Sequence, residues 1–253
     1  MLIKINLFEK IDLKGYTFLE GFPGAGLVGP MAISYIIEKL SLKYIGYIES
    51  DRFPPLIAIH GEKPLPAVRL YAQEKTKVVT ILAEFAIPID LTYTIVDKIY
   101  DFIKENGISK IVSIGGIPSQ QQDIDQQSVF VIASTEELKK EAVKAGLRAV
   151  GEGVATGINA MLMLKTATDN VPDMSILIPV DPNILDPKYA ELAILSLNKL
   201  INLGVDIKEL DKEAKEVEAK IKDVLKKNRE VQEAHRKAVG GANTDDSGPS
   251  MYA

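Results

Sequence analysis

Cysteine and tryptophan are absent from this chain of 253 residues, and histidine occurs only twice, as His60 and His235. Without cysteine, neither disulfide bonds nor cysteine-ligated metal centres can form. The two histidines are far apart in the sequence and lack carboxylates at metal-ligand spacing, so we predict no metal site. The sequence also has no phosphate-binding Gly-Lys-Ser/Thr motif and no serine in a nucleophile elbow, so its motifs favour a protein that is not an enzyme.

Long apolar runs and blocks of basic charge are missing as well. No stretch approaches the about 18 apolar residues that a membrane helix needs, and residues 1–6 are too short and too alternating for a signal peptide. We therefore expect a soluble, cytoplasmic protein without a membrane partner. A net charge of −5, scattered basic residues and few aromatic side chains disfavour a nucleic-acid partner.

What is present is enough apolar sequence for a substantial core, since 46% of the residues are hydrophobic. Short runs of β-type pattern alternate with longer helical patterns along residues 1–204. Strands are predicted at 3–7, 16–20, 44–49, before 61, around 69–71, 78–83, 111–117, 130–132, 149–150 and 175–180. Helices are predicted after 29, at 88–106, after 134, at 158–166 and at 187–203. This alternation favours a three-layer α/β/α sandwich with a largely parallel sheet.

Residues 205–239 have the pattern of one long helix that projects from this domain. Apolar residues recur from Ile207 at alternating steps of three and four, with Asn228 and His235 as the polar positions of the seam. Asp206 and Glu209 form a capping box, and Gly204 is expected to end the preceding helix. Pairing two such helices in parallel would oppose like charges, so we predict an antiparallel hairpin with the helix at 187–203.

Residues 240–253 form the third part of the predicted organisation. The stretch 240–250 contains no residue able to build a core, and it is expected to be a flexible tether. The last three residues of the sequence, Met251, Tyr252 and Ala253, add two apolar side chains to this polar tail. A solvated tail gains nothing from such an ending, which indicates a binding role.

A glycine-rich turn after the second strand leaves two interpretations open. Gly24, Gly26 and Gly29 match the spacing of a dinucleotide fingerprint, and Glu49 or Asp51 stands about where an acid would contact the ribose. The alternative is a tight strand-to-helix turn in which small residues allow close packing. A lone match to this spacing is a weak signal for nucleotide binding.

The phrase Glu-Gly-Phe-Pro-Gly-Ala-Gly-Leu-Val-Gly at residues 20–29 carries a more specific signal. With Ser-Asp-Arg-Phe-Pro-Pro at 50–55, Arg-Leu-Tyr at 69–71 and the glycine-ended strand at 111–117, it resembles the archaeal and bacterial branch of the proteasome assembly chaperone family. The resemblance spans about residues 16–225. It implies the phosphorylase/hydrolase-like form of the α/β/α sandwich, a non-enzymatic protein and no cofactor.

The terminal Met251, Tyr252 and Ala253 resemble the hydrophobic-tyrosine-X (HbYX) motif with which proteasome activators dock. This resemblance implies binding to the alpha-subunit ring of the 20S core particle and ATP-independent activation by gate opening. Weak single tails would need avidity, which implies a homo-oligomer, with a tetramer favoured and a pentamer possible. The alternatives are a pure assembly chaperone for alpha subunits, and a nucleotide-binding enzyme that uses Gly24, Gly26, Gly29 and Glu49.

Overall fold

The structure is a computed structural model that describes residues 3–119, 128–182 and 184–208. Its strands are β1 (Ile3–Leu7), β2 (Thr17–Gly21), β3 (Lys43–Ser50), β4 (Ala58–His60), β5 (Lys63–Leu65), β6 (Val68–Gln73), β7 (Val78–Ala83), β8 (Lys110–Pro118), β9 (Phe130–Ala133), β10 (Arg148–Ala149) and β11 (Asp173–Val180). Its helices are α1 (Val28–Lys39), α2 (Thr92–Glu105), α3 (Glu136–Lys144), α4 (Gly157–Thr168) and α5 (Pro187–Ile201). Short 3-10 turns, η1 (Ala25–Leu27) and η2 (Ile89–Leu91), precede α1 and α2.

The main sheet has nine strands in the order β1-β3-β6-β7-β2-β8-β11-β9-β10. Its centre is parallel, because β2 pairs in parallel with both β7 and β8, and β8 pairs in parallel with β11. The flanks are mixed: β1, β3 and β6 pair in antiparallel fashion, and β9 runs antiparallel to β11. The α/β fold is as predicted, with the parallel pairing concentrated in the middle of the sheet.

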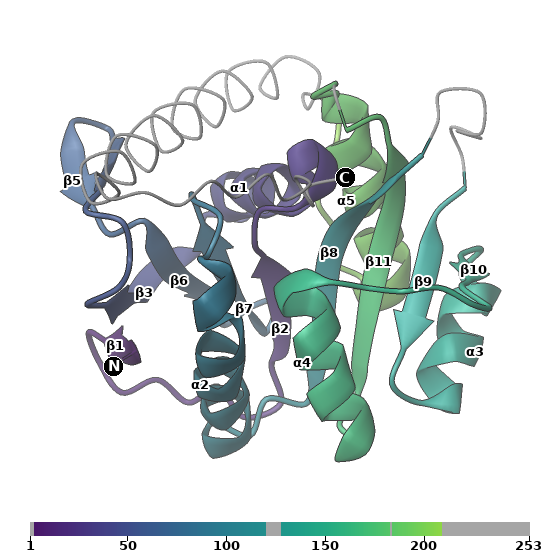
Figure 1. Ribbon diagram of the computed structural model, residues 1–253, viewed down its shortest axis with the longest axis horizontal. Coiled ribbons are helices and arrows are strands. Elements are labelled where there is room, and N and C mark those ends of the chain that lie inside the picture. The colour runs from purple at the N-terminus through teal and green to yellow at the C-terminus, as the bar shows by residue number, and fades with distance from the viewer. Residues whose placement is uncertain (1–2, 120–127, 183, 209–253) are drawn as a thin grey trace, which may run out of the picture.

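Helices cover both faces of this sheet and complete the three layers (Figure 1). On one face α1 and α5 pack together, and on the other α2 packs beside α4. Successive residues of β2 serve the two cores, since Phe18 contributes to the α2/α4 side and Leu19 to the α1/α5 side. Both side chains are fully buried, which is the pattern expected for a central strand with helices on either face.

The helix predicted at 88–106 is α2, and its apolar residues Ile95, Ile99, Phe102 and Ile103 are all buried on one face. The helix begins at Thr92 rather than at Pro88, since residues 89–91 form the 3-10 turn. Helix α3, predicted to follow residue 134, is capped by Thr135. Thr135 accepts the hydrogen bond from the Leu138 amide, while the Ser134 hydroxyl donates to the Val171 carbonyl in a neighbouring loop.

Helix α5 ends at Ile201, two residues before the predicted end at residue 203. Asn202 adopts the left-handed conformation directly after Ile201, with φ of 49°, and Gly204 follows with φ of 70°. Asp206 does accept a hydrogen bond from the Lys208 amide, as a residue at a helix start does. Most of the predicted projecting helix, its antiparallel pairing and the whole of residues 240–253 lie outside the described residues. In the described part of the chain, no helix is both long and apolar enough to span a bilayer.

Candidate functional site

The predicted docking residues Met251, Tyr252 and Ala253 lie outside the described residues, as do Asn228 and His235. What the structure does describe is the base of the segment that carries them. Residues 203–208 leave α5 and lie against the domain, where the Tyr35 hydroxyl of α1 donates a hydrogen bond to the Asp206 carbonyl over 2.9 Å. The segment therefore starts from a defined place on the α1/α5 face.

The glycine-rich turn follows β2 at the end of the sheet where β7, β8 and β11 also finish. Gly26 has φ of +63°, and a Cβ atom there would lie 2.9 Å from the Cγ1 atom of Val180. A Cβ on Gly29 would lie 2.8 Å from the Ile114 carbonyl oxygen. Such separations are too short for a side chain, so these two glycines let the turn pack directly onto β8 and β11.

Gly24 differs from its two neighbours in the fingerprint. Its backbone is extended, with φ of −151°, and a Cβ there would meet no atom within 4 Å. In a dinucleotide site the second glycine lets the pyrophosphate approach the backbone. Here Val180 occupies the space beside that glycine, Gly26, which favours the packing interpretation of the turn.

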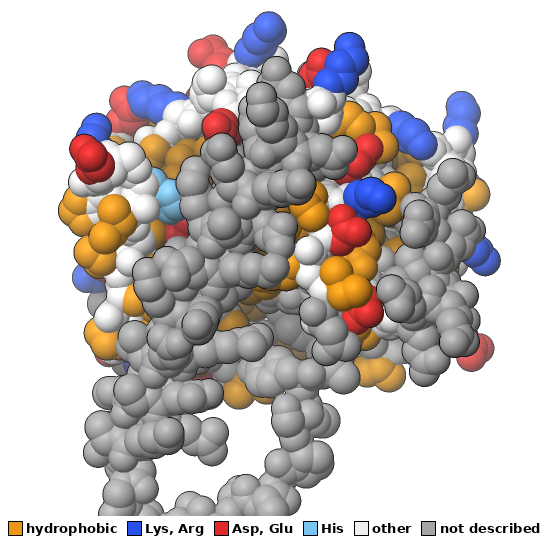
Figure 2. All heavy atoms as spheres, turned by 90° about the horizontal axis from the view of Figure 1, so that it is seen from above, with side chains coloured by type: hydrophobic (Ala, Val, Ile, Leu, Met, Phe, Trp, Pro, Cys, Tyr) orange, Lys and Arg blue, Asp and Glu red, His pale blue; other side chains and the backbone are white. Residues whose placement is uncertain are grey.

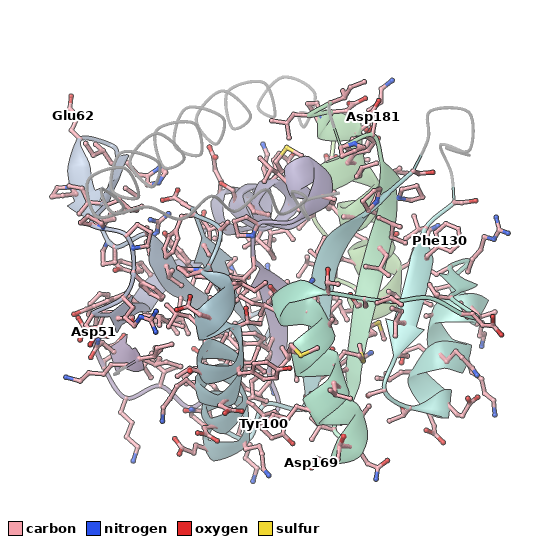
Figure 3. The ribbon with its side chains drawn as sticks, viewed as in Figure 1. Asp51, Glu62, Tyr100, Phe130, Asp169 and Asp181 are labelled. Atoms are coloured by element: carbon pink, nitrogen blue, oxygen red, sulfur yellow. The ribbon has the colours of Figure 1, made fainter. Side chains whose placement is uncertain are left out.

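Glu49 is not brought to the glycine-rich turn. It lies on β3 opposite Lys4 of β1, and β6 and β7 separate β3 from β2. Three strand spacings correspond to about 14 Å across the sheet. A dinucleotide fold would instead place the next strand directly beside β2. Asp51, in the turn after β3, shares this distant position at the left of Figure 3.

Sequence reasoning missed a buried acid inside the family-like phrase. Glu20 of β2 is fully buried, and its Oε1 atom accepts a hydrogen bond of 3.0 Å from the Phe22 amide, while Oε2 has no partner. Burial raises the pKa of Glu20 to about 8, with the Phe22 hydrogen bond opposing the shift. The side chain is therefore mostly neutral at pH 7. An acid inside an otherwise apolar strand is the one sequence signal that pointed to it.

Asp173, at the start of β11, is a second buried acid. Its Oδ2 atom accepts a hydrogen bond of 2.8 Å from the Thr166 hydroxyl, and burial raises its pKa to about 7. Glu20 is in register with Ser113 of β8, whereas Asp173 is in register with Ile111. The two acids are thus on strands separated by β8 and at different levels, and they do not form a catalytic pair.

A third polar group surrounds Arg69, a β6 residue that is only 1% exposed. Its guanidinium donates to Glu84, to the Tyr71 hydroxyl and to the Pro66 carbonyl. Glu84 also contacts His60 of β4 at 2.6 Å. Burial raises the pKa of Glu84, but the hydrogen bonds from His60 and Arg69 outweigh it, so this pKa lies below its ordinary value. The cluster fastens the β4–β5 hairpin, whose tip carries Glu62 in Figure 3, to the main sheet.

These polar groups do not combine into a site for metal chemistry. Among residues 3–119, 128–182 and 184–208, no group of three histidine or acidic side chains has a metal-binding arrangement. Figure 2 looks down on the end of the sheet that carries the glycine-rich turn, and there basic side chains alternate with acidic ones among apolar side chains. A surface with interspersed charge of both signs is suited to protein contacts rather than to a polyanion.

Similarity to solved structures supports the same fold. The chain is similar to Pyrococcus furiosus PbaA, described as an archaeal homolog of proteasome-assembly chaperone, with a TM-score of 0.81 and 26% identity over 93% of this chain and 100% of that one. It also shares the fold of P. furiosus PbaB, described as an archaeal proteasome activator, with a TM-score of 0.73 and 22% identity over 88% of this chain and 98% of that one.

Sequence comparison gives the family. The chain is 32% identical over 213 residues to the uncharacterized protein MJ0106 of Methanocaldococcus jannaschii, a match that covers 81% of this chain and 84% of that protein. Residues 18–225 match the pattern of the PAC2 family, which confirms the resemblance seen at residues 20–29. Because that match extends over most of the sequence, the chain belongs to the PAC2 family.

Proposed function

We propose that this chain is a non-enzymatic protein that docks on the alpha-subunit ring of the 20S proteasome core particle and activates it without ATP by opening its gate. The observation that carries the proposal is the combination of a PAC2 domain with the terminal Met251, Tyr252 and Ala253. The similarity to PbaA supports a proteasome partner, and the shared fold with PbaB, an archaeal proteasome activator, supports activation as the outcome.

The chemistry of the terminal triplet suits a pocket between two subunits. Met251 fills an apolar slot, Tyr252 adds aromatic area and a hydroxyl hydrogen bond, and the Ala253 carboxylate pairs with a cation. We propose that the 11 residues at 240–250 act as a tether, for which a random-coil chain of that length gives a span of about 18 Å. One triplet binds weakly, and several on one homo-oligomer raise the avidity by about 10² to 10⁴. A tetramer fits this requirement best, and a pentamer also meets it.

A non-enzymatic role is supported by the chemistry of the described residues. Glu20 and Asp173, the acids with raised pKa values, stand apart, and the glycine-rich turn is filled by its own packing. The nucleotide-binding alternative rests on Gly24, Gly26, Gly29 and Glu49, which are not gathered at one place. Calorimetric titration with NAD, NADP and ATP decides it, because saturable micromolar binding would restore the enzyme interpretation.

The test of the proposal is peptide hydrolysis by purified archaeal core particles in the absence of nucleotide. We expect the intact chain to accelerate hydrolysis of a fluorogenic peptide, and a chain ending at Ser250 to have no effect. A matched control carries the same number of residues with Met251, Tyr252 and Ala253 replaced by serine. Stimulation by the chain that ends at Ser250, at the level of the intact chain, would overturn the docking mechanism.

A second candidate, a pure assembly chaperone for alpha subunits, is favoured by the description of PbaA as a chaperone homolog. Such a chaperone would bind the same alpha subunits, but before they assemble into the ring. Mixing the chain with free alpha subunits and with assembled core particles separates the two. Binding to free subunits alone, without stimulation of assembled particles, would replace activation with assembly.

A further inference from the structure

Residues 203–207, which follow α5, pack against the domain before the C-terminal segment begins. Leu203 and Val205 are 3% and 4% exposed and belong to the apolar cluster between α1, α5 and the sheet. Ile207 packs against the same cluster from its edge. A chain released freely from the end of α5 would not bury alternate residues in this way, so the junction is part of the folded domain.

Asn198, on the last turn of α5, clamps this junction. Its Nδ2 group donates to the Val205 carbonyl over 2.8 Å, and its Oδ1 atom accepts from the Val205 amide over 3.0 Å. One amide side chain thus satisfies both backbone groups of a single residue, as a neighbouring strand would. Two opposed hydrogen bonds fix the orientation of the Val205 backbone as well as its distance from α5.

Tyr35 provides a second point of attachment from α1. Its side chain is almost fully buried, and its hydroxyl donates to the Asp206 carbonyl over 2.9 Å. The Asp206 carboxylate also accepts a hydrogen bond from the Lys208 amide over 3.0 Å. The chain is therefore held from two helices, at consecutive residues.

The backbone between α5 and this clamp is bent by two left-handed residues. Asn202 has φ of 49° and Gly204 has φ of 70°. Asparagine and glycine are the residues that adopt this conformation most readily after a helix, so the two residue types account for the bend. The hydrogen bonds from Asn198 and Tyr35 hold the chain at the far side of the bend.

We propose that Asn198 and Tyr35 are positioning residues, which fix the point and the direction at which the C-terminal segment leaves the domain. The inference rests on the proposed function, since it assigns this geometry a role in presenting Met251, Tyr252 and Ala253. When the C-terminal segment leaves the domain at a fixed point and in a fixed direction, its terminus explores a smaller volume. This raises the effective concentration of the triplet at the pockets of a docked oligomer.

The first test measures geometry without the proteasome. Because the chain has no cysteine, Glu38→Cys and Glu216→Cys provide the only two spin-label sites, and dilution with unlabelled chain removes distances between subunits. We expect the distance distribution to widen at least about twofold when Asn198→Ala and Tyr35→Phe are combined, with at least about tenfold faster exchange of the Val205 amide. An unchanged distribution would overturn the proposal.

Matched controls remove comparable hydrogen bonds that do not reach the junction. Ser196→Ala deletes a hydroxyl that donates to Leu192 within α5, and Tyr189→Phe deletes a hydroxyl that accepts from the Asp181 amide. Both should keep the narrow distribution. Tyr35→Phe alone keeps the buried ring, so it supplies the measurement if Asn198→Ala fails to fold.

The second test uses core particles and separates positioning from general stability. The combined variant should need at least about threefold more protein for half-maximal stimulation, while the maximal stimulation is retained. A less fixed start of the C-terminal segment lowers the affinity for the core particle but leaves gate opening by a bound triplet unchanged. A widened distribution with an unchanged half-maximal concentration would refute the positioning role. If removing Met251, Tyr252 and Ala253 leaves stimulation intact, the proposed function fails, and the distance measurement still decides whether Asn198 and Tyr35 fix the segment.

Discussion

Arg69 and Glu84 form an ion pair inside the domain, with 2.9 Å between Nη1 and Oε2 and side chains that are 1% and 8% exposed. The pair joins β6 to the end of β7, and His60 brings the β4–β5 hairpin to the same carboxylate. A buried ion pair gains little net free energy over an apolar pair, but removing one partner leaves the other charge without compensation.

Glu84→Ala should therefore lower the free energy of unfolding by about 3–5 kcal/mol. Urea unfolding followed by circular dichroism measures the loss. Glu136→Ala is the matched control, because Glu136 pairs with Lys139 on the surface of α3 and its removal should leave the unfolding midpoint unchanged. A Glu84→Ala variant with the parent midpoint would show that the cluster around Arg69 does not brace the fold.

Glu20 should make stability fall as the pH rises through neutrality. Its pKa is raised from 4.5 to about 8, so between these values the native state holds a proton that the unfolded chain has released. The folded state is then disfavoured by about 1.4 kcal/mol per pH unit across that window. Glu20→Gln should flatten this part of the profile, as urea unfolding at a series of pH values will show. Asp173 acts in the same direction up to about pH 7.

Gly26→Ala should destabilise the domain by about 1–3 kcal/mol, since it combines a left-handed backbone with a contact against Val180. Gly24→Ala, two residues away in the same turn, has an extended backbone and open space and should change stability little. Thermal unfolding of both variants is the measurement. If both variants lost the same stability, packing against β11 would not explain why position 26 is a glycine.

Tyr252 should be the most sensitive position of the terminal triplet. Tyr252→Ala removes aromatic area and the hydroxyl, and should abolish stimulation of the core particle. Tyr252→Phe keeps the area and leaves a pocket partner unsatisfied, at a cost of about 1–3 kcal/mol per site. Its affinity, measured by surface plasmon resonance on immobilised core particles, should be intermediate. One residue added after Ala253 should also weaken binding, because it moves the carboxylate away from its cation.

The domain alone should keep the oligomeric state of the intact chain. We predict assembly through the α/β domain, because parallel pairing of the projecting helix would oppose like charges. The chain should be truncated after Lys208, since Val205 and Asp206 belong to the clamped junction and are kept. Light scattering should then give an unchanged subunit number. A monomer would place the interface on the C-terminal segment.

Most helices and strands could be predicted from periodicity, although the short strand β5 was missed, and the order of the strands in the sheet could not be predicted. The spacing of Ile95, Ile99 and Phe102 determines which face of α2 is buried, because a helix repeats every 3.6 residues. Nothing in the pattern of β3 indicates that β6 and β7 separate it from β2. A buried strand has apolar residues on both faces wherever it lies in the sheet, so strand order and the position of Glu49 required the structure.

The roles of single polar residues could not be predicted from the sequence either. Ser134 and Thr135 are both good caps, and only the Val171 carbonyl and the Asp173 amide near Ser134 decide that Thr135 caps α3. Asn198 reads as an ordinary polar residue of a helix, because its partner is seven residues ahead and beyond a bend. Contacts of this kind depend on chain direction, which local sequence patterns do not encode.

The position of β2 at the middle of the sheet also sets the order in which the chain can fold during synthesis. β2 ends at Gly21, but its two neighbours are completed only at Ala83 and Pro118. Until β8 has emerged from the ribosome, the nascent chain carries a strand with an open edge that is apolar on both faces. Such a strand is prone to aggregate. Nearly half of the chain, up to Pro118, must therefore be synthesised before β2 has both of its neighbours and the centre of the sheet can close.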